Sequence, residues 1–219
     1  MQLALYSYWR SSSAWRVRIG LHFKGVPFDY RAVDLRAGVQ FEDAHRSRNP
    51  LGQVPVLEVR DGPAVRHLAQ SMAILEFLEE RFPSPPLLPQ DAFGRARVRM
   101  IAEMVNSGIQ PWQNQATQKW LRAKQPGLEK EWVQHWLTRG MAALERAVSS
   151  GAGRYAHGDA VSLADVYVVP QLYGARRFGI DLGDCPTLLA VEAACSELPA
   201  FQAAEPAQQP DAPQDGERS

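Results

Sequence analysis

The chain has 219 residues, which suits one large domain or two smaller ones that share an interface. Hydrophobic residues make up 45% of the sequence and charged residues 22%, as in an ordinary soluble globular protein. Its 24 basic residues balance its 24 acidic ones, so the basic excess typical of nucleic-acid-binding proteins is missing, and we expect a small-molecule or protein partner and no nucleic acid.

Local patterns disfavour two further classes of protein. The N-terminus lacks the basic segment and long apolar run of a signal peptide, and no apolar run approaches the ~18–20 residues that span a bilayer. We therefore expect a cytoplasmic protein with no membrane partner. Cys185 and Cys195 are the two cysteines, and the sequence has no CxxC or Cys/His cluster. We expect no metal site and two reduced thiols, with a disulfide between them as the alternative.

Short apolar runs alternate with helical patterns over residues 1–83, which predicts an α/β domain. Asp61-Gly62 lies between the last two of these apolar runs and predicts a hairpin turn. The expected element order is β-α-β-α-β-β-α, with strands over 3–6, 28–35, 54–59 and 64–68, and helices over 15–24, 41–46 and 71–81.

The second part of the chain is expected to be helical. Residues 83–89 contain four prolines, which a helix cannot continue through, so we expect a linker over 84–89. An all-helical domain should follow over 90–203, and then a disordered tail over 204–219 that is rich in Pro, Gln and acidic residues. Ser162 and Asp165 have the spacing of a capping box. The expected helices cover 93–124 with a kink at Pro111, 128–149, 162–177 and 187–198.

Three consecutive serines, Ser11, Ser12 and Ser13, lie between the first expected strand and the first expected helix. In an open α/β sheet ligands bind at the carboxyl ends of strands, and a serine at a helix start can cap the helix. The same hydroxyls and the positive helix end can stabilise a bound anion such as a thiolate, whose parent thiol has a pKa of about 8.5. Serines before a helix more often act only as a cap, so both interpretations stay open.

Two other stretches could hold a ligand. Val54-Pro55 stands where a loop enters a strand; a cis bond there would expose the Val54 backbone to an extended peptide, whereas a trans proline is the commoner case. Ser71 is expected to be the N-cap of the helix over 71–81, where its amide could also bind a carboxylate. None of the five histidines has an acidic or cysteine partner at catalytic spacing, so we expect each to be a surface or core residue.

Taken together, these stretches resemble the zeta class of glutathione transferases, a family that includes maleylacetoacetate and maleylpyruvate isomerases. The resemblance extends over nearly the whole chain, to about residue 201. In the first half it rests on Tyr6-Ser7-Tyr8-Trp9-Arg10-Ser11-Ser12, Trp15-Arg16-Val17-Arg18-Ile19, Asn49-Pro50, Gln53-Val54-Pro55, Gln70-Ser71 and Leu87-Leu88-Pro89. In the second half it rests on Ile109-Gln110-Pro111, Gln113-Asn114, Leu163-Ala164-Asp165, Val169-Pro170-Gln171 and Arg177-Phe178.

The resemblance implies a glutathione transferase fold, with a thioredoxin-like α/β N-terminal domain, an all-α C-terminal domain and a homodimer. It implies glutathione as the cofactor, with Ser11 and Ser12 contacting or activating its sulfur. It also implies a cis Val54-Pro55 bond, so that the Val54 backbone pairs with the cysteinyl part. The full set of implied glutathione contacts is Ser11, Ser12, Ser13, Gln40, Gln53, Val54, Gln70, Ser71, Gln110 and Asn114.

The implied activity is cis–trans isomerisation of a dicarboxylic enone, maleylacetoacetate to fumarylacetoacetate or maleylpyruvate to fumarylpyruvate, in aromatic amino-acid or aromatic-compound catabolism. In this comparison Gln70 and Ser71 would hold the γ-glutamyl carboxylate of glutathione. Arg10 and Arg177 resemble the arginines that bind the substrate carboxylates, a task that suits the bidentate guanidinium. The adjacent Arg176 is the alternative to Arg177.

Two positions depart from the family pattern. Ser13 stands where many members carry cysteine, and Ala14 stands where many carry serine. Isomerisation takes its thiol from glutathione, so the departure bears on redox or dehalogenation chemistry rather than on isomerisation. Two alternatives stay open: a glutathione transferase that conjugates or dehalogenates small electrophiles such as α-halo acids, and a non-catalytic binding protein with the transferase fold.

Overall fold

The computed structural model describes residues 1–213, which form two compact units. The first unit consists of Met1–Pro86 together with the C-terminal segment that begins at Leu198, and the second is Leu87–Glu197. The change from the first unit to the second falls inside the expected linker over 84–89.

The first unit contains a four-stranded mixed sheet with the order β2-β1-β3-β4. β1 runs parallel to β2 and antiparallel to β3, and β3 forms the expected hairpin with β4. The expected strand over 54–59 begins only at Val56, because Pro55 has no N–H to donate to a neighbouring strand. The strands are β1 (Gln2–Ser7), β2 (Asp29–Ala32), β3 (Val56–Asp61) and β4 (Ala64–Ala69).

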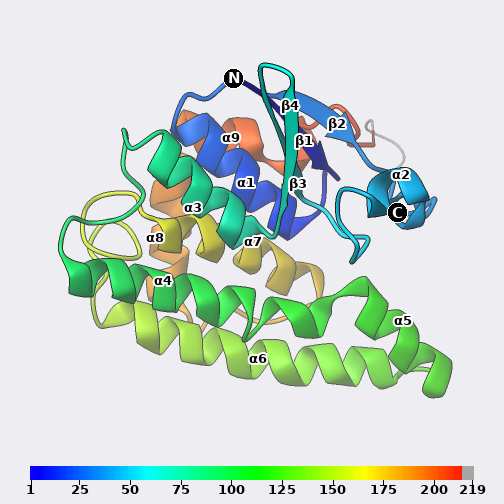
Figure 1. Ribbon diagram of the computed structural model, residues 1–219. Coiled ribbons are helices and arrows are strands. Elements are labelled where there is room, and N and C mark those ends of the chain that lie inside the picture. Colours follow the sequence, from blue (N-terminus) through cyan, green and yellow to red (C-terminus); the bar gives the residue numbers. More distant parts are fainter. Residues whose placement is uncertain (214–219) are drawn as a thin grey trace. The chain divides into compact units, whose positions relative to one another are not determined.

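Helix α1 is the most buried helix element beside this sheet, and it contacts both α3 and α9 (Figure 1). Residues 14–21 of α1 are all buried. α1 and α3 approach closely at Gly20, where a Cβ atom would lie only 2.4 Å from Leu75 Cδ2. The helices of the first unit are α1 (Ser12–Phe23), η1 (Val39–Phe41), α2 (Asp43–Arg46), α3 (Ser71–Arg81), α9 (Pro199–Ala204) and η3 (Pro206–Gln208).

The C-terminal segment is ordered as far as residue 213, which corrects the expectation of a disordered tail from residue 204. Gln209 Nε2 donates to the carbonyl oxygens of Ala203 at 3.0 Å and Glu205 at 2.8 Å, so the chain folds back on α9. A proline- and glutamine-rich composition predicts disorder only for a segment that finds no partners, and this segment finds them in the first unit. The helical second unit correspondingly ends at Glu197 rather than at residue 203. Residues 214–219 of the expected tail lie outside the described residues.

The second unit is built from helices, and the single helix expected over 93–124 is divided into three. The chain leaves α4 after Asn106 in a tight turn at Gly108, where a Cβ would lie 2.7 Å from the Met104 carbonyl oxygen, and Pro111 further on has no N–H with which to continue a helix. Figure 1 shows α4 and α6 running side by side. The helices are α4 (Ala92–Asn106), η2 (Gln110–Gln113), α5 (Gln115–Lys124), α6 (Leu128–Ser149), α7 (Leu163–Arg177) and α8 (Pro186–Ser196).

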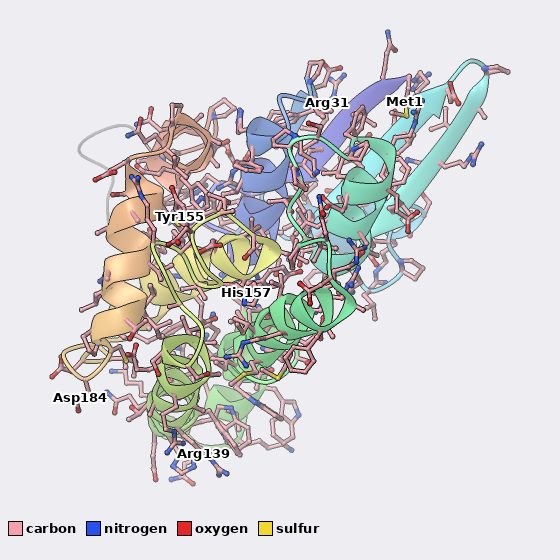
Figure 2. All side chains as sticks on the ribbon, turned by 90° about the vertical axis from the view of Figure 1, so that its left-hand side faces the viewer. Met1, Arg31, Arg139, Tyr155, His157 and Asp184 are labelled. Carbon is pink, nitrogen blue, oxygen red and sulfur yellow. The ribbon has the colours of Figure 1, made fainter. Side chains whose placement is uncertain are left out.

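Helix α7 forms the core of the second unit and begins at the predicted capping box. Residues 163–172 are all buried, and α7 packs against α4 and α8. Ser162 N–H donates to Asp165 Oδ2 at 2.7 Å, and Ala156 N–H donates to Asp165 Oδ1 at 2.7 Å. Burial raises the pKa of Asp165, although these hydrogen bonds act in the opposite direction. The loop that enters α7 carries Tyr155 and His157 (Figure 2).

The architecture confirms the predicted fold class, an α/β N-terminal domain with a helical remainder. No helix among the described residues is long and apolar enough to cross a membrane. The described residues also hold no group of three or more side chains placed to bind a metal ion. Cys185 and Cys195 are buried free thiols, in agreement with the expectation of reduced cysteines.

Candidate functional site

The serine run lies at the start of α1, directly after the loop that leaves β1. Ser11 is the N-cap residue: its backbone is extended, with φ −69° and ψ 116°, and its hydroxyl accepts from Ala14 N–H at 3.2 Å. Ser12 and Ser13 already belong to the first turn of the helix. The serine run was predicted to cap the helix, and Ser11 alone does so. Ser12 and Ser13 remain available for other contacts.

The N-terminus of α1 keeps several hydrogen-bond donors available. Over residues 1–213, neither the hydroxyls nor the backbone amides of Ser12 and Ser13 have a hydrogen-bond partner. The Ser11 hydroxyl accepts one hydrogen bond and can still donate its own proton. No acidic residue lies in the first turn to compete for these donors. A helix end of this kind is suited to bind an anion, because its free amides and its dipole both present positive charge.

Arg10 immediately precedes the capping serine and is half-buried. Its Cζ atom lies 5.2 Å from the centroid of the Trp9 ring, in a cation–π contact. The described part of the chain offers the guanidinium no ion-pair or hydrogen-bond partner. The positive charge of Arg10 is therefore available to an anionic ligand beside the open end of α1.

The turn before β3 has the cis Val54-Pro55 bond that the family resemblance implies. Neither the N–H nor the C=O of Val54 has a hydrogen-bond partner among the described residues, although only 9% of the residue is exposed. Backbone groups left unpaired next to a strand can pair with an extended peptide. The adjacent Gln53 side chain is exposed. The turn therefore has the backbone geometry expected of a peptide-binding segment.

Two buried side chains hold this turn, and the sequence did not indicate their role. His45 Nε2 lies 3.0 Å from the Gln53 carbonyl oxygen, and Asn49 Nδ2 donates to the same oxygen at 2.9 Å. Asn49 Oδ1 accepts from Leu51 N–H at 3.2 Å. Because a carbonyl oxygen only accepts, His45 carries its proton on Nε2. Asn49 stands in the family motif and could have been singled out, whereas no local signal marks His45.

Gln40 in η1 lies behind the same turn. Its side chain is almost fully buried: Nε2 lies 3.4 Å from the Leu35 carbonyl oxygen, and Oε1 has no hydrogen-bond partner. Gly52 has a φ of 61°, and a Cβ there would lie 2.9 Å from the Gln40 carbonyl oxygen, so a larger residue would displace η1 or the turn. Gln40 thus supports the turn from behind and keeps one acceptor free.

Helix α3 covers the predicted range, Ser71–Arg81, but its N-cap is not the predicted residue. Gln70 is its N-cap, with φ 72° and ψ 120°, and Ser71 is the first helical residue, so the prediction of Ser71 as the N-cap is wrong. The Ser71 side chain is buried and accepts from Arg16 Nη1 at 3.4 Å, which turns it away from the capping position. Among the described residues, Gln70 is the single non-glycine residue with a positive φ. Backbone strain of this kind concentrates at functional sites.

The first unit brings several of these predicted elements close together. Tyr8 and Val54 belong to one buried apolar cluster, and Trp9 packs against it, so the loop that carries Arg10 adjoins the Val54 turn. The hydrogen bond from Arg16 to the Ser71 hydroxyl joins α1 to the start of α3. The first unit therefore contains the unpaired backbone groups of Val54 together with the N-termini of α1 and α3.

Two of the predicted glutathione contacts, Gln110 and Asn114, lie in the second unit and bind each other. Gln110 Nε2 donates to Asn114 Oδ1 at 2.8 Å. Between them Gln113 is buried and exchanges amide contacts of 3.3 and 3.4 Å with Gln171 of α7. This pairing holds η2 against α7 and thereby sets the positions of Gln110 and Asn114.

The two adjacent arginines at the end of α7 differ in their surroundings. Arg176 forms a bidentate ion pair with Glu192 of α8, and this pairing raises the pKa of Arg176. Arg177 Cζ lies 5.5 Å from the centroid of the Phe178 ring. Because its charge is already neutralised by a carboxylate, Arg176 is the poorer candidate for binding an anionic substrate.

Comparison with known proteins assigns the chain to a family. Residues 10–81 match the family model described as the N-terminal domain of glutathione S-transferase. A probable maleylacetoacetate isomerase 2 of Drosophila melanogaster is 46% identical over 215 residues, which cover 97% of this chain and 92% of the relative. A maleylpyruvate isomerase of Ralstonia sp. is 44% identical over 215 residues, which cover 95% of this chain and 99% of the relative.

A solved structure agrees with these relatives over both units. The crystal structure of maleylacetoacetate isomerase from Anaeromyxobacter dehalogenans with bound GSH in the active site has 61% sequence identity and a TM-score of 0.92, and the match covers 97% of this chain and 98% of that one. The same isomerase, with bound dicarboxyethyl glutathione and citrate in the active site, gives a TM-score of 0.91. The chain therefore belongs to the zeta class of glutathione transferases, the family of the maleylacetoacetate and maleylpyruvate isomerases.

Proposed function

We propose that this protein is a glutathione-dependent cis–trans isomerase of a dicarboxylic enone, either maleylacetoacetate or maleylpyruvate. One observation carries the proposal: the open N-terminus of α1, where the unpaired donors of Ser12 and Ser13 adjoin the unpaired cation of Arg10. A thiolate and a carboxylate are both anions, and this arrangement offers each its own binding group. The relative crystallised with dicarboxyethyl glutathione and citrate supports a dicarboxylate as the substrate class.

The first unit has groups that fit each part of glutathione. The unpaired N–H and C=O of Val54 suit the cysteinyl part, which they would pair with as a neighbouring strand does, and the exposed Gln53 side chain lies beside it. The N-terminus of α3, with Gln70 and Ser71, suits the γ-glutamyl carboxylate. Further proposed contacts are Gln40, Gln110 and Asn114.

Glutathione supplies a thiolate that adds reversibly to one alkene carbon, so that the double bond becomes single, rotates, and re-forms as the trans isomer when the thiolate leaves. Ser11 and Ser12 donate hydroxyl hydrogen bonds to the sulfur, and the free amides of α1 add positive potential. Each pKa unit by which these groups favour the thiolate corresponds to about 1.4 kcal/mol. No protein cysteine takes part, so Ser13 in place of the common cysteine is compatible with this chemistry.

Arg10 binds one substrate carboxylate and stabilises the negative charge that develops on the enone as the double bond opens. For the second carboxylate we propose Arg177, as the family resemblance implies. The ion pair between Arg176 and Glu192 makes Arg176 the poorer candidate, since a guanidinium already bound to a carboxylate gains less from a second one.

We also propose that the protein works as a homodimer in the cytoplasm, in the catabolism of aromatic amino acids or other aromatic compounds. Phe93 and Met100 of α4 are 78% and 46% exposed, and such apolar side chains on one helix support an interface between two copies. Light scattering of the purified protein should give twice the mass of one chain. A monomer at micromolar concentration would contradict the dimer.

The assay for this function is turnover of both maleyl substrates with and without glutathione, with dichloroacetate included to detect the dehalogenating alternative. Arg10→Ala should lower kcat/KM for the isomerised substrate by roughly 100-fold or more, because it removes a charged group that stabilises the transition state. Arg66→Ala is the matched control, since Arg66 is an exposed arginine on β4. Equal activity of the two variants would refute the role of Arg10.

A further inference from the structure

The C-terminal segment of residues 198–213, which we call the C-terminal strap, packs against the helix that begins at the serine run. Its helix α9 contacts α1, and η3 follows α9. Gln209 folds the rest of the strap back through its hydrogen bonds to the carbonyl oxygens of Ala203 and Glu205. The strap thereby brings Asp211 to the β1–α1 loop, 202 positions earlier in the chain.

Asp211 binds two groups of the first unit with its carboxylate. Oδ2 accepts from the Trp9 backbone N–H at 3.0 Å, and Oδ1 accepts from the Tyr30 hydroxyl at 2.6 Å. Tyr30 belongs to β2, which is paired with β1. Hydrogen bonds to an ionised carboxylate are about twice as strong as neutral ones, so these two fix the strap to the loop.

Arg18 of α1 holds the same loop through the other polar group of Trp9. Its fully buried guanidinium donates through Nη2 to the Trp9 carbonyl oxygen at 2.9 Å and through Nε to the Ala204 carbonyl oxygen of the strap at 3.0 Å. The pKa of Arg18 is lowered to about 10, because the effect of burial outweighs the opposing effects of Tyr30 and Asp211. Arg18 therefore stays charged at neutral pH. Both backbone polar groups of Trp9 are thus held by charged side chains, one from the strap and one from α1.

Arg10, whose side chain is proposed to bind the substrate, directly follows Trp9 in the chain. The Arg10 guanidinium lies over the Trp9 ring, and over residues 1–213 it has no hydrogen bond or ion pair that would orient it otherwise. A shift of Trp9 would move both the peptide from which Arg10 extends and the ring on which its guanidinium rests. The orientation of Arg10 therefore depends on what holds Trp9.

We propose that Asp211 is a positioning residue, which holds the Trp9 backbone N–H so that Arg10 is presented to a substrate carboxylate. The proposal rests on the function proposed for Arg10. If the strap only stabilised the fold, its loss would weaken the binding of the dicarboxylate and of glutathione alike. A strap that positions Arg10 acts mainly on the dicarboxylate, because the proposed glutathione contacts at Val54 and the start of α3 lie outside this loop and Ser11 is also held by its hydrogen bonds to Tyr8 and Ala14.

The test compares Asp211→Ala and Asp211→Asn in the full chain. Asp181→Ala is the matched control, because Asp181 is an exposed carboxylate of the second unit that also accepts one backbone hydrogen bond, from Gly183 N–H at 2.9 Å. Backbone hydrogen exchange over residues 7–11 reports the Trp9 amide in the free protein. Steady-state kinetics with the dicarboxylate and calorimetry with glutathione report the two ligands separately.

Asp211→Ala should speed exchange at Trp9 and lower kcat/KM for the dicarboxylate roughly 10- to 100-fold, mainly through KM, because a misplacement of about 1 Å has effects of this size. The Kd for glutathione should change less than about threefold. Asp211→Asn keeps an acceptor for the Trp9 N–H and should recover most of the activity. Asp181→Ala should match the wild type in all three measurements.

Faster exchange with unchanged kcat/KM in Asp211→Ala would overturn the positioning role and leave the proposed function intact. Equal losses of glutathione affinity and of kcat/KM, without rescue by Asp211→Asn, would overturn it as well, because they indicate a structural role only. A wild-type protein that turns over neither maleyl substrate would refute the proposed function and the role of Asp211 with it. That outcome is recognised in the wild type before any variant is compared.

Discussion

We assign two roles to Ser11, as the cap of α1 and as a donor to the glutathione sulfur, and substitution can separate them. Ser11→Ala removes the acceptor of the Ala14 N–H and the donor to the sulfur together. Loss of an N-cap costs about 1 kcal/mol of stability. For a chain of this length, that loss lowers Tm by roughly 2–4 °C.

Ser11→Asp keeps the first role and removes the second. The carboxylate still accepts from the Ala14 N–H and interacts favourably with the helix dipole, so the free energy of unfolding should stay within about 0.5 kcal/mol of the wild type. It cannot donate a hydrogen bond, and its charge repels a thiolate. The thiol pKa of bound glutathione should therefore rise by about one unit, which corresponds to ~1.4 kcal/mol.

Two measurements check the Ser11 series: denaturant unfolding for the cap, and titration of the thiolate absorbance of bound glutathione for the donor. We expect the two properties to separate, with Ser11→Ala losing both the cap and the thiolate stabilisation and Ser11→Asp losing only the thiolate stabilisation. If Ser11→Asp bound and ionised glutathione as the wild type does, the reasoning that the open end of α1 receives a thiolate would be refuted.

Three further predictions concern the rest of the site. Asn49→Ala removes two hydrogen bonds of the turn beside the unpaired backbone, and should cost about 2 kcal/mol of stability and weaken glutathione binding roughly tenfold by calorimetry; unchanged affinity would show that the turn needs no such support. Arg176→Ala should retain most isomerase activity, whereas Arg177→Ala should lose roughly 100-fold in kcat/KM; the reverse order would exchange their roles. Burial raises the pKa of both Cys185 and Cys195, so less thiolate forms at pH 8 and a thiol reagent should react slowly until denaturant is added; fast labelling of the native protein would contradict their burial.

Features set by neighbouring residues could be predicted from the sequence. The hairpin at Asp61-Gly62, the capping box of Ser162 and Asp165, and the helix start at the serine run all depend on contacts within a few positions. The family motif also predicted the cis Val54-Pro55 bond, which the neighbouring residues alone did not predict.

Features set by distant contacts could not be predicted in this way. The C-terminal strap looks disordered by composition, and its order depends on hydrogen bonds from Arg18 and Trp9, 186 and 202 positions away. Charged residues such as Arg16 and Arg18 are normally expected at the surface, yet both are fully buried because strap, sheet and α3 provide acceptors. His45 likewise gains its role only when the fold brings it to the Gln53 carbonyl oxygen.

We propose that the open end of α1, beside Arg10, serves glutathione-dependent isomerisation of a dicarboxylic enone. The most direct test follows the alkene protons of maleylacetoacetate and of maleylpyruvate by NMR with wild-type protein, with and without glutathione. We expect conversion of at least one cis substrate to its trans isomer only when glutathione is present, with no net consumption of glutathione. Conversion of neither substrate by protein that binds glutathione would contradict it.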